Sequence, residues 1–220
     1  VQRIAYVDID AHHCDGVALG FAGDPDCLMI SVHEEGLWPR TGLIEDDAGG
    51  NAINLPVSRG FNDAEMAHVR DALVLPKIAE FQPDAIVFLC GADGVEDDPL
   101  AHLSLTNNAH WDLLRGLMAL DAPRLLVLGG GGYNPWTVGR LWTGVWGVLN
   151  GHIPEAYVTT EAGEVLRALT FDGNSRGRNP PEHWFTTLRD VPQEGEVIRA
   201  QILERVALLA SRPVPSARPA

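Results

Sequence analysis

The chain has 220 residues, of which 45% are hydrophobic, and this length and composition suit one sizeable α/β core. The formal net charge of −14 argues against nucleic-acid binding, which needs a basic surface, and no apolar run reaches the roughly 18 residues of a membrane helix. Three cysteines without metal-type spacing indicate buried, reduced thiols in a cytoplasmic protein.

The first predicted element is a strand over residues 3–10 that ends among carboxylates and imidazoles. Side chains alternate along a strand, so Asp8, Asp10 and His12 are predicted to project to one side as the strand ends. Two carboxylates that point together repel unless a cation or a shared proton lies between them, and a neutral imidazole is a common zinc ligand. The pattern therefore predicts a metal site rather than a strand end that faces water.

Further strands are predicted over residues 27–32, 52–57, 84–90 and 124–128. Helical patterns follow over residues 63–81, 107–120, 135–149, 161–169 and 197–210. Asp63 is expected to cap the first of these helices, and Pro76 to kink it. The segment between residues 169 and 197 is predicted to be a loop that lies over the surface.

Strands that alternate with helices predict an α/β fold of three layers, with a mainly parallel sheet between helices. Ligands of such sheets bind outside the carboxyl ends of the strands. Several polar residues fall at or just past those ends: Asp8, Asp10, His12, Ser31, Asp93 and Tyr133. We expect one core domain over residues 1–150 and a carboxyl-terminal extension over 151–220 whose helices pack on that domain.

Three motifs occur in order: DIDAHH at residues 8–13, CGAD at 90–93 and GGGGY at 129–133. Together they resemble the zinc-dependent histone deacetylase family, including its bacterial acetoin-utilisation and acetylpolyamine members, over residues 3–148. The resemblance implies an arginase/deacetylase-type fold and hydrolysis of N-acetyl amides. The implied substrate is the acetylated lysine side chain of a protein or peptide, or a small acetylated amine.

In this resemblance Asp10, His12 and Asp93 match the zinc ligands of the family, and ferrous iron also suits two oxygens and one nitrogen. The metal-activated water would attack the acetyl carbonyl, and the hydroxyl of Tyr133 would stabilise the oxyanion.

Trp38 and Leu100 match the walls of the channel that holds the lysine methylenes, and Gly131 matches the position whose carbonyl meets the substrate amide. Leu100 favours lysine over polyamines, because polyamine-selective relatives tend to carry a carboxylate there.

The resemblance also implies a structural potassium ion. Asp8 and Ser31, with the main-chain carbonyls of Asp10, His12 and Val32, match its ligands, and the cation would offset the repulsion between Asp8 and Asp10. A weaker match places a second alkali ion on the carbonyls near four residues: Phe21, Asp24, Cys27 and Asn51.

Two positions depart from the family pattern. Cys14 stands where the family usually has glycine. The paired histidines that act as general base and acid belong upstream of Asp8, outside this chain, and Asp8 and Asp15 match the carboxylates that orient them. His13 is predicted to face away and not to replace them. We therefore interpret the chain as the carboxyl-terminal part of a deacetylase, weak or inactive alone, since each lost group costs about 10²- to 10⁴-fold.

Other functions remain open at this point. A binuclear manganese ureohydrolase shares the start of the first motif but requires an aspartate where Cys14 stands and a carboxylate where Val95 stands. A non-catalytic binding module would explain the absent histidines. A phosphate site at residues 129–132 lacks both the third glycine and the lysine that such loops require. A homo-oligomer is compatible with the sequence.

Overall fold

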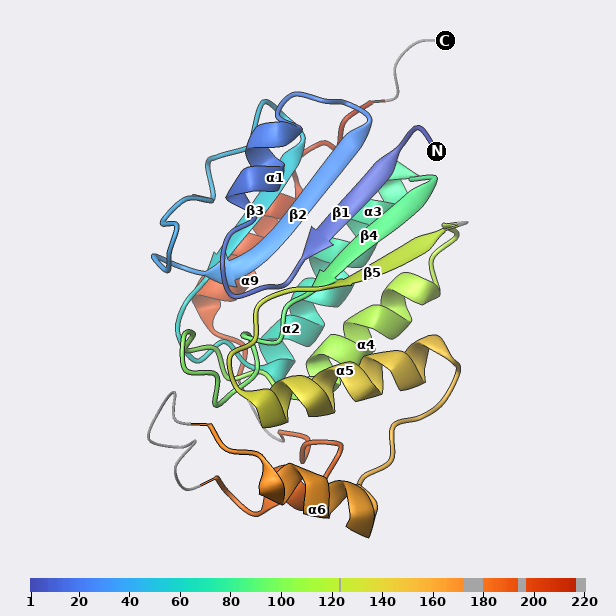
Figure 1. The fold of residues 1–220 in the computed structure, drawn as a ribbon. Coiled ribbons are helices and arrows are strands. Elements are labelled where there is room, and N and C mark those ends of the chain that lie inside the picture. The colour runs from blue at the N-terminus through green and yellow to red at the C-terminus, as the bar shows by residue number, and fades with distance from the viewer. Residues whose placement is uncertain (123, 172–179, 194–196, 217–220) are drawn as a thin grey trace.

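In a computed structural model that describes residues 1–122, 124–171, 180–193 and 197–216, the chain forms a five-stranded sheet with helices on both faces (Figure 1). The strand order is β3-β2-β1-β4-β5, and each neighbouring pair is parallel. The strands are β1 (Ile4–Asp8), β2 (Cys27–Glu34), β3 (Ala52–Val57), β4 (Ala85–Cys90) and β5 (Leu125–Gly129). The predicted α/β fold is confirmed.

Most helices lie behind the sheet in Figure 1, and α1 (Asp15–Gly20) lies on the opposite face. The rear layer contains α2 (Asp63–Val69), η1 (Arg70–Val74), α3 (Leu75–Phe81), α4 (Asn107–Met118), α5 (Pro135–Leu149) and α9 (Ala200–Ala210). Strand alternation divides the core between the two faces, because Val7 and Phe88 pack towards the rear helices and Tyr6 packs with Ala18 of α1. None of the described helices is both long and apolar enough to cross a membrane.

The helix predicted over residues 63–81 contains a π-helical turn, η1, between α2 and α3. Pro76 has no N–H to donate, and its ring crowds the carbonyl four residues earlier, that of Ala72. That carbonyl lies in η1, so the widened turn accommodates the proline without ending the helical segment.

The cap of α2 differs from the prediction. Asn62, not Asp63, is the N-cap, and it forms a capping box with Glu65. Asp63 instead accepts hydrogen bonds from the backbone N–H and the hydroxyl of Thr106, at 2.8 and 2.5 Å. The carboxylate therefore links the start of α2 to the start of α4.

The carboxyl-terminal segment is more structured than the predicted surface loop. In its described part, α8 (His183–Thr186) buries Trp184 and Phe185. The ring of Trp184 stacks on that of Trp136 in α5, with the ring centroids 5.4 Å apart. Helix α6 (Thr160–Ala168) lies beyond α5, away from the sheet (Figure 1). Aromatic burial orders this segment, and residues 172–179 and 194–196 of the predicted loop lie outside the described residues.

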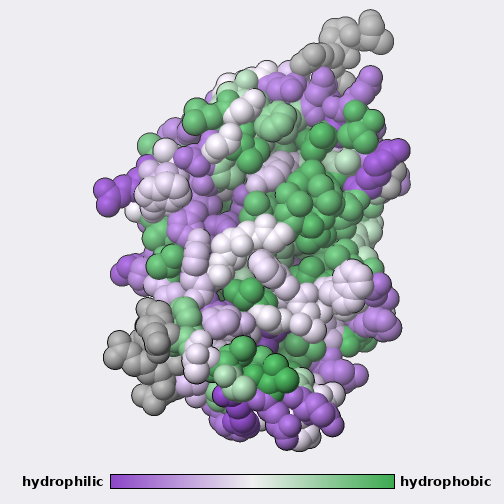
Figure 2. Space-filling model, viewed as in Figure 1, coloured by the Kyte–Doolittle hydropathy of each residue, from purple (hydrophilic) through white to green (hydrophobic). Residues whose placement is uncertain are grey.

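One part of the sheet has an exposed apolar face. Leu126 and Leu128 of β5 are 54% and 37% exposed, and by strand alternation they face away from the core on which Leu125 and Val127 pack. Figure 2 shows a hydrophobic area over β4 and β5 on this side. Within the described part of the chain, β5 pairs with β4 alone, so its outer edge is open.

The topology brings two loops together at the centre of the sheet. Strands β2 and β3 extend it from one side of β1, and β4 and β5 extend it from the other. The loops after the adjacent strands β1 and β4 start side by side and lead to opposite sides of the sheet. This place is a topological switch point, where open parallel sheets bind ligands. Asp8 pairs in register with Leu89, so both strands end at the same level.

Buried His110 is expected to make the protein acid-sensitive. Its Nε2 lies 3.0 Å from the carbonyl of Gly91, and burial lowers the pKa of the imidazole from 6.5 to about 4. Below pH 6.5 the imidazole is protonated in the unfolded chain but stays neutral in the folded chain. The free energy of unfolding therefore falls as the pH drops towards 4, and this residue accounts for roughly 3 kcal/mol of the loss.

Urea denaturation between pH 7 and 4 measures this loss. His110→Gln should show a shallower pH dependence than the wild type whatever its absolute stability. An equal slope in both proteins would contradict the assignment.

Candidate metal centre

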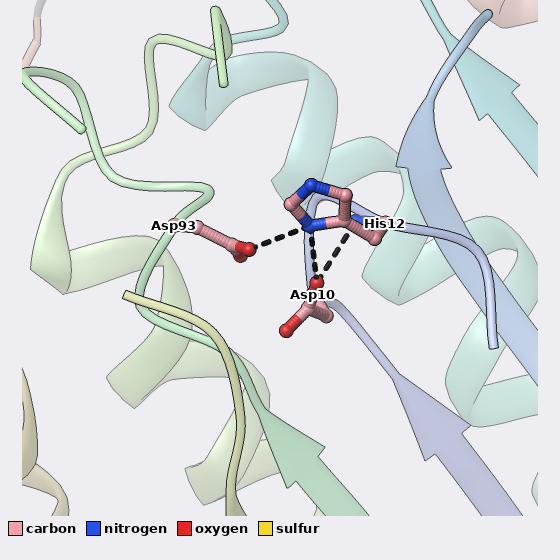
Figure 3. A group of neighbouring side chains, drawn as sticks. All are labelled: Asp10, His12 and Asp93. Atoms are coloured by element: carbon pink, nitrogen blue, oxygen red, sulfur yellow. Dashed lines mark hydrogen bonds and ion pairs between the residues drawn. The ribbon is translucent and has the colours of Figure 1, made fainter. Parts of the chain in front are cut away.

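Three side chains converge where β1 and β4 end. Asp10, His12 and Asp93 each offer one ligand atom, and these atoms lie within 4.8 Å of one another. His12 Nδ1 is 3.0 Å from Asp10 Oδ1 and 2.9 Å from Asp93 Oδ2 (Figure 3). Within the described residues this is the one group of at least three potential ligands found. The three residues that the sequence singled out as metal ligands thus lie together.

The chain reaches this arrangement by turns rather than by strand alternation. Strand β1 ends at Asp8, two residues earlier than predicted. Asp8 Oδ1 then accepts the N–H of Asp10, and Asp10 Oδ1 accepts the N–H of His12, both at 2.9 Å. Aspartates that accept the N–H two residues ahead compete with strand pairing. The prediction that residues 3–10 form one strand was therefore wrong at its end.

Backbone N–H groups hold both ligand carboxylates. Asp93 is fully buried, and its Oδ1 accepts the N–H of Ala11 at 2.8 Å, which leaves Oδ2 facing His12. Asp10 Oδ2 accepts the N–H of Gly131 at 2.6 Å. The loops after β1, β4 and β5 are thereby joined through the two carboxylates.

The electrostatics of the group suit a cation. Hydrogen bonds with Asp10 and Asp93 raise the pKa of His12 to about 10, so the metal-free ring carries a proton between the two carboxylates. Burial raises the pKa of Asp93. Burial would also raise the pKa of Asp10, but hydrogen bonds from His12 and the N–H of Gly131 lower it. Two carboxylate oxygens and one imidazole nitrogen form a donor set that fits zinc or ferrous iron, which would take the place of the proton.

The glycine run after β5 passes directly over the ligands. A Cβ atom on Gly131 would lie 2.9 Å from Asp10 Oδ2 and would collide with Asp93 Oδ2. Glycine is required here because the backbone itself contacts the carboxylates.

Gly131→Ala is therefore expected to lower metal affinity about 10- to 100-fold and the free energy of unfolding by about 1 to 3 kcal/mol. The matched control is Gly139→Ala in α5, where an added Cβ meets nothing within 4 Å. At that exposed helical position, alanine should raise the free energy of unfolding by about 0.5 to 1 kcal/mol. Zinc titration and urea denaturation of both variants test the pair, and equal behaviour would refute the contact.

Two aromatic rings lie near His12. The ring centroids of Trp38 and Tyr133 are 6.4 and 6.5 Å from that of His12, in edge-on orientations. Both rings are exposed, as is Leu100 at 48%. The carbonyl of Gly131, which the resemblance assigns to the substrate amide, accepts the N–H of Ala92 at 2.6 Å and has a second lone pair left.

Asp98 is a site residue that sequence reasoning missed. Its side chain is buried, and its two oxygens accept the N–H of Leu100 at 2.8 Å and the N–H of Tyr133 at 2.7 Å. One carboxylate thus positions both the tyrosine and the predicted channel wall. It acts on backbone groups, so no pattern of side-chain types reveals it, although an aspartate before Pro99 in a loop is a usual turn signal.

The proposed potassium ligands Asp8 and Ser31 face each other in the β1–β2 register, and both are buried. The partners of Asp8 are neutral: the hydroxyl of Tyr6 at 2.7 Å and the N–H of Asp10. Burial raises the pKa of Asp8 to about 7. A buried carboxylate with neutral partners fits a monovalent cation beside it.

The remaining predicted residues lie apart from the three ligands. His13 contacts Thr41 and Asn54 at 2.8 and 3.1 Å, and it packs on His33 with ring centroids 4.8 Å apart. The ring is therefore engaged outside the cluster. Asp15 begins α1 and accepts the N–H of Gly16 at 2.8 Å.

Comparison with known proteins agrees with this geometry. Residues 1–149 match the family described as histone deacetylase domain. Histone deacetylase 6 of Arabidopsis thaliana is 36% identical over 146 residues, which are 64% of this chain and 31% of that protein. Acetoin utilization protein AcuC of Bacillus subtilis is 34% identical over 172 residues, 71% of this chain and 44% of that protein.

Solved structures show the same fold. An HDAC homolog from Aquifex aeolicus superposes with a TM-score of 0.85 and 27% identity, over 96% of this chain and 57% of that chain. An HDAC homolog complexed with SAHA gives a TM-score of 0.81 and 26% identity. The chain thus spans less than half of the length of these two curated relatives and 57% of the length of the structural one.

Proposed function

Because this chain belongs to the histone deacetylase family, we propose that it hydrolyses N-acetyl amides, with the acetylated lysine side chain of a protein or peptide as its main substrate. A small acetylated amine is the second substrate class. The observation that carries the proposal is the meeting of Asp10, His12 and Asp93 at the switch point of the sheet, beside the rings of Trp38 and Tyr133.

Asp10, His12 and Asp93 would hold one zinc ion, or ferrous iron. When bound, the metal supplies Lewis acidity towards the acetyl carbonyl and lowers the pKa of a bound water. A single ligand group among the described residues favours one metal over the two of a ureohydrolase. The apolar side chain of Val95, where the second metal of that class needs a carboxylate, is buried and supports the same choice.

The other residues would bind and orient the substrate. The hydroxyl of Tyr133 would donate a hydrogen bond to the oxygen that becomes negatively charged, and Asp98 would hold that residue in place through its N–H. Trp38 and Leu100 would pack on the lysine methylenes and exclude water. Leu100 carries no charge, which favours a lysine side chain over a cationic polyamine.

Proton transfer would be the weak step in this chain. His13 is bonded to Thr41 and Asn54, and His110 is buried against the carbonyl of Gly91. Neither ring is available as a general base at the cluster. We therefore expect these 220 residues by themselves to hydrolyse the substrate more slowly, by about 10²- to 10⁴-fold for each proton-transfer group that they do not supply.

A potassium ion next to the three metal ligands would stabilise the site. Asp8 and Ser31, with the carbonyls of Asp10, His12 and Val32, would form its ligand set. The positive charge would keep the buried carboxylate of Asp8 ionised and would reduce its repulsion with Asp10.

The decisive test is deacetylation of an acetyl-lysine peptide by the zinc-loaded chain at enzyme excess, followed by mass spectrometry. We expect slow loss of the acetyl group that stops on chelation and resumes when zinc is added. Binding of SAHA, measured by calorimetry, provides a readout that needs no hydrolysis. SAHA or peptide binding without any hydrolysis would favour the non-catalytic binding module, and two tightly bound manganese ions would favour the ureohydrolase.

A further inference from the structure

Three backbone carbonyls converge on one side-chain nitrogen at the start of β3. Asn51 Nδ2 lies 2.7 Å from the carbonyl oxygen of Phe21 and 3.0 Å from those of Asp24 and Cys27. Asn51 is 2% exposed, and its Oδ1 accepts the N–H of Gly23 at 3.1 Å. The three carbonyl oxygens assign the two ends of the amide, because only the nitrogen can donate to them.

The carbonyls of Phe21, Asp24 and Cys27 form a cradle that has more acceptors than the amide of Asn51 has donors. The amide nitrogen carries two hydrogens, so three carbonyls must share them. Several carbonyl oxygens directed at one point are the arrangement by which proteins replace the hydration shell of an alkali cation. The nitrogen of Asn51 occupies the position that a cation bound by these same carbonyls would need. The residues present therefore do not fit a second ion while the amide is there.

We propose that the side-chain amide of Asn51 takes the place of the second alkali ion that the family resemblance implies at these carbonyls. The N–H donors neutralise the carbonyl dipoles that the ion would otherwise neutralise. The loop between α1 and β2 is then held by the chain itself, and its order does not depend on the alkali-ion concentration.

The backbone keeps Asn51 at this position. Its carbonyl accepts the N–H of Met29 and its N–H donates to the carbonyl of Asp47, at 2.9 and 3.0 Å. The backbone of this residue is therefore fixed between β2 and the loop before β3, and its side chain extends towards the three carbonyls.

Counting bound ions tests the proposal. Thallium(I), a potassium mimic, is measured by mass spectrometry after equilibrium dialysis of the zinc-loaded protein. Asn51→Ala should bind one equivalent more than the wild type, and its melting temperature should rise when potassium chloride replaces tetramethylammonium chloride at equal concentration. Asn150→Ala, which removes an exposed amide bonded to the carbonyl of Trp146, is the control and should gain no ion.

A second variant covers the case in which Asn51→Ala does not fold. Asn51→Asp keeps the acceptor for Gly23 but places an anion against three carbonyl oxygens, so its folding should require potassium or thallium. The proposal is overturned if both variants match the wild type in ion count and in salt response. Because the readout is a difference between proteins, it does not depend on the ion proposed at Asp8 or on deacetylase activity.

Discussion

Replacing Asp93 by asparagine is expected to lower zinc affinity by roughly 10²- to 10³-fold, because it removes one partner of a buried charge pair. The amide keeps the shape of the carboxylate, and its oxygen can still accept the N–H of Ala11. The edge that faces His12 would instead carry an N–H₂ group, which cannot bind a cation.

A competition titration against a chromophoric zinc chelator measures this loss, and circular dichroism checks the fold. The control is Asp15→Asn, which removes a carboxylate of the same sequence region that accepts the N–H of the adjacent Gly16. That variant should bind zinc as the wild type does. If both variants lose affinity equally, general charge and not ligation explains the effect.

Replacing Tyr133 by phenylalanine is expected to slow hydrolysis of the acetyl-lysine peptide by about 10²- to 10³-fold, the usual result of removing one donor to an oxyanion. The ring would keep its place near His12, because Asp98 holds the backbone N–H of this residue. Zinc affinity should stay unchanged, since the hydroxyl is not among the three ligands.

Single-turnover rates at enzyme excess give the effect on the chemical step separately from substrate binding. Tyr157→Phe provides the matched control, because that tyrosine is 73% exposed. A variant at Tyr133 that hydrolyses at the wild-type rate would remove the tyrosine from the proposed mechanism.

The strands and the position of the site could be predicted from the sequence because both depend on local patterns. Short apolar runs separated by helical segments indicate a parallel sheet, and polar residues after those runs must meet at one edge. Asp10, His12 and Asp93 were among the six residues that this rule selected, and the family resemblance singled them out as the metal ligands. The role of Tyr133 likewise needed the family resemblance, since a tyrosine at the start of a helix is common.

The errors come from interactions that a side-chain pattern does not contain. The end of β1 depends on Asp8 and Asp10 accepting backbone N–H groups, and the role of Asp98 depends on the N–H groups of Leu100 and Tyr133. Similarly, the order of α8 depends on contacts between aromatic rings far apart in the sequence. The second alkali ion was expected from the family resemblance, which matches backbone positions but does not show where the side-chain amide of Asn51 lies.

The open edge of β5 bears on how the isolated protein behaves in solution. The strand LLVLG has no charged residue and no proline, the two features that commonly prevent sheets from joining edge to edge. Electrostatic repulsion between copies that each have a net charge of −14 opposes such joining at low ionic strength. Added salt screens that repulsion but leaves the apolar contact in place, so self-association should grow with ionic strength, contrary to the behaviour of assemblies held by ion pairs.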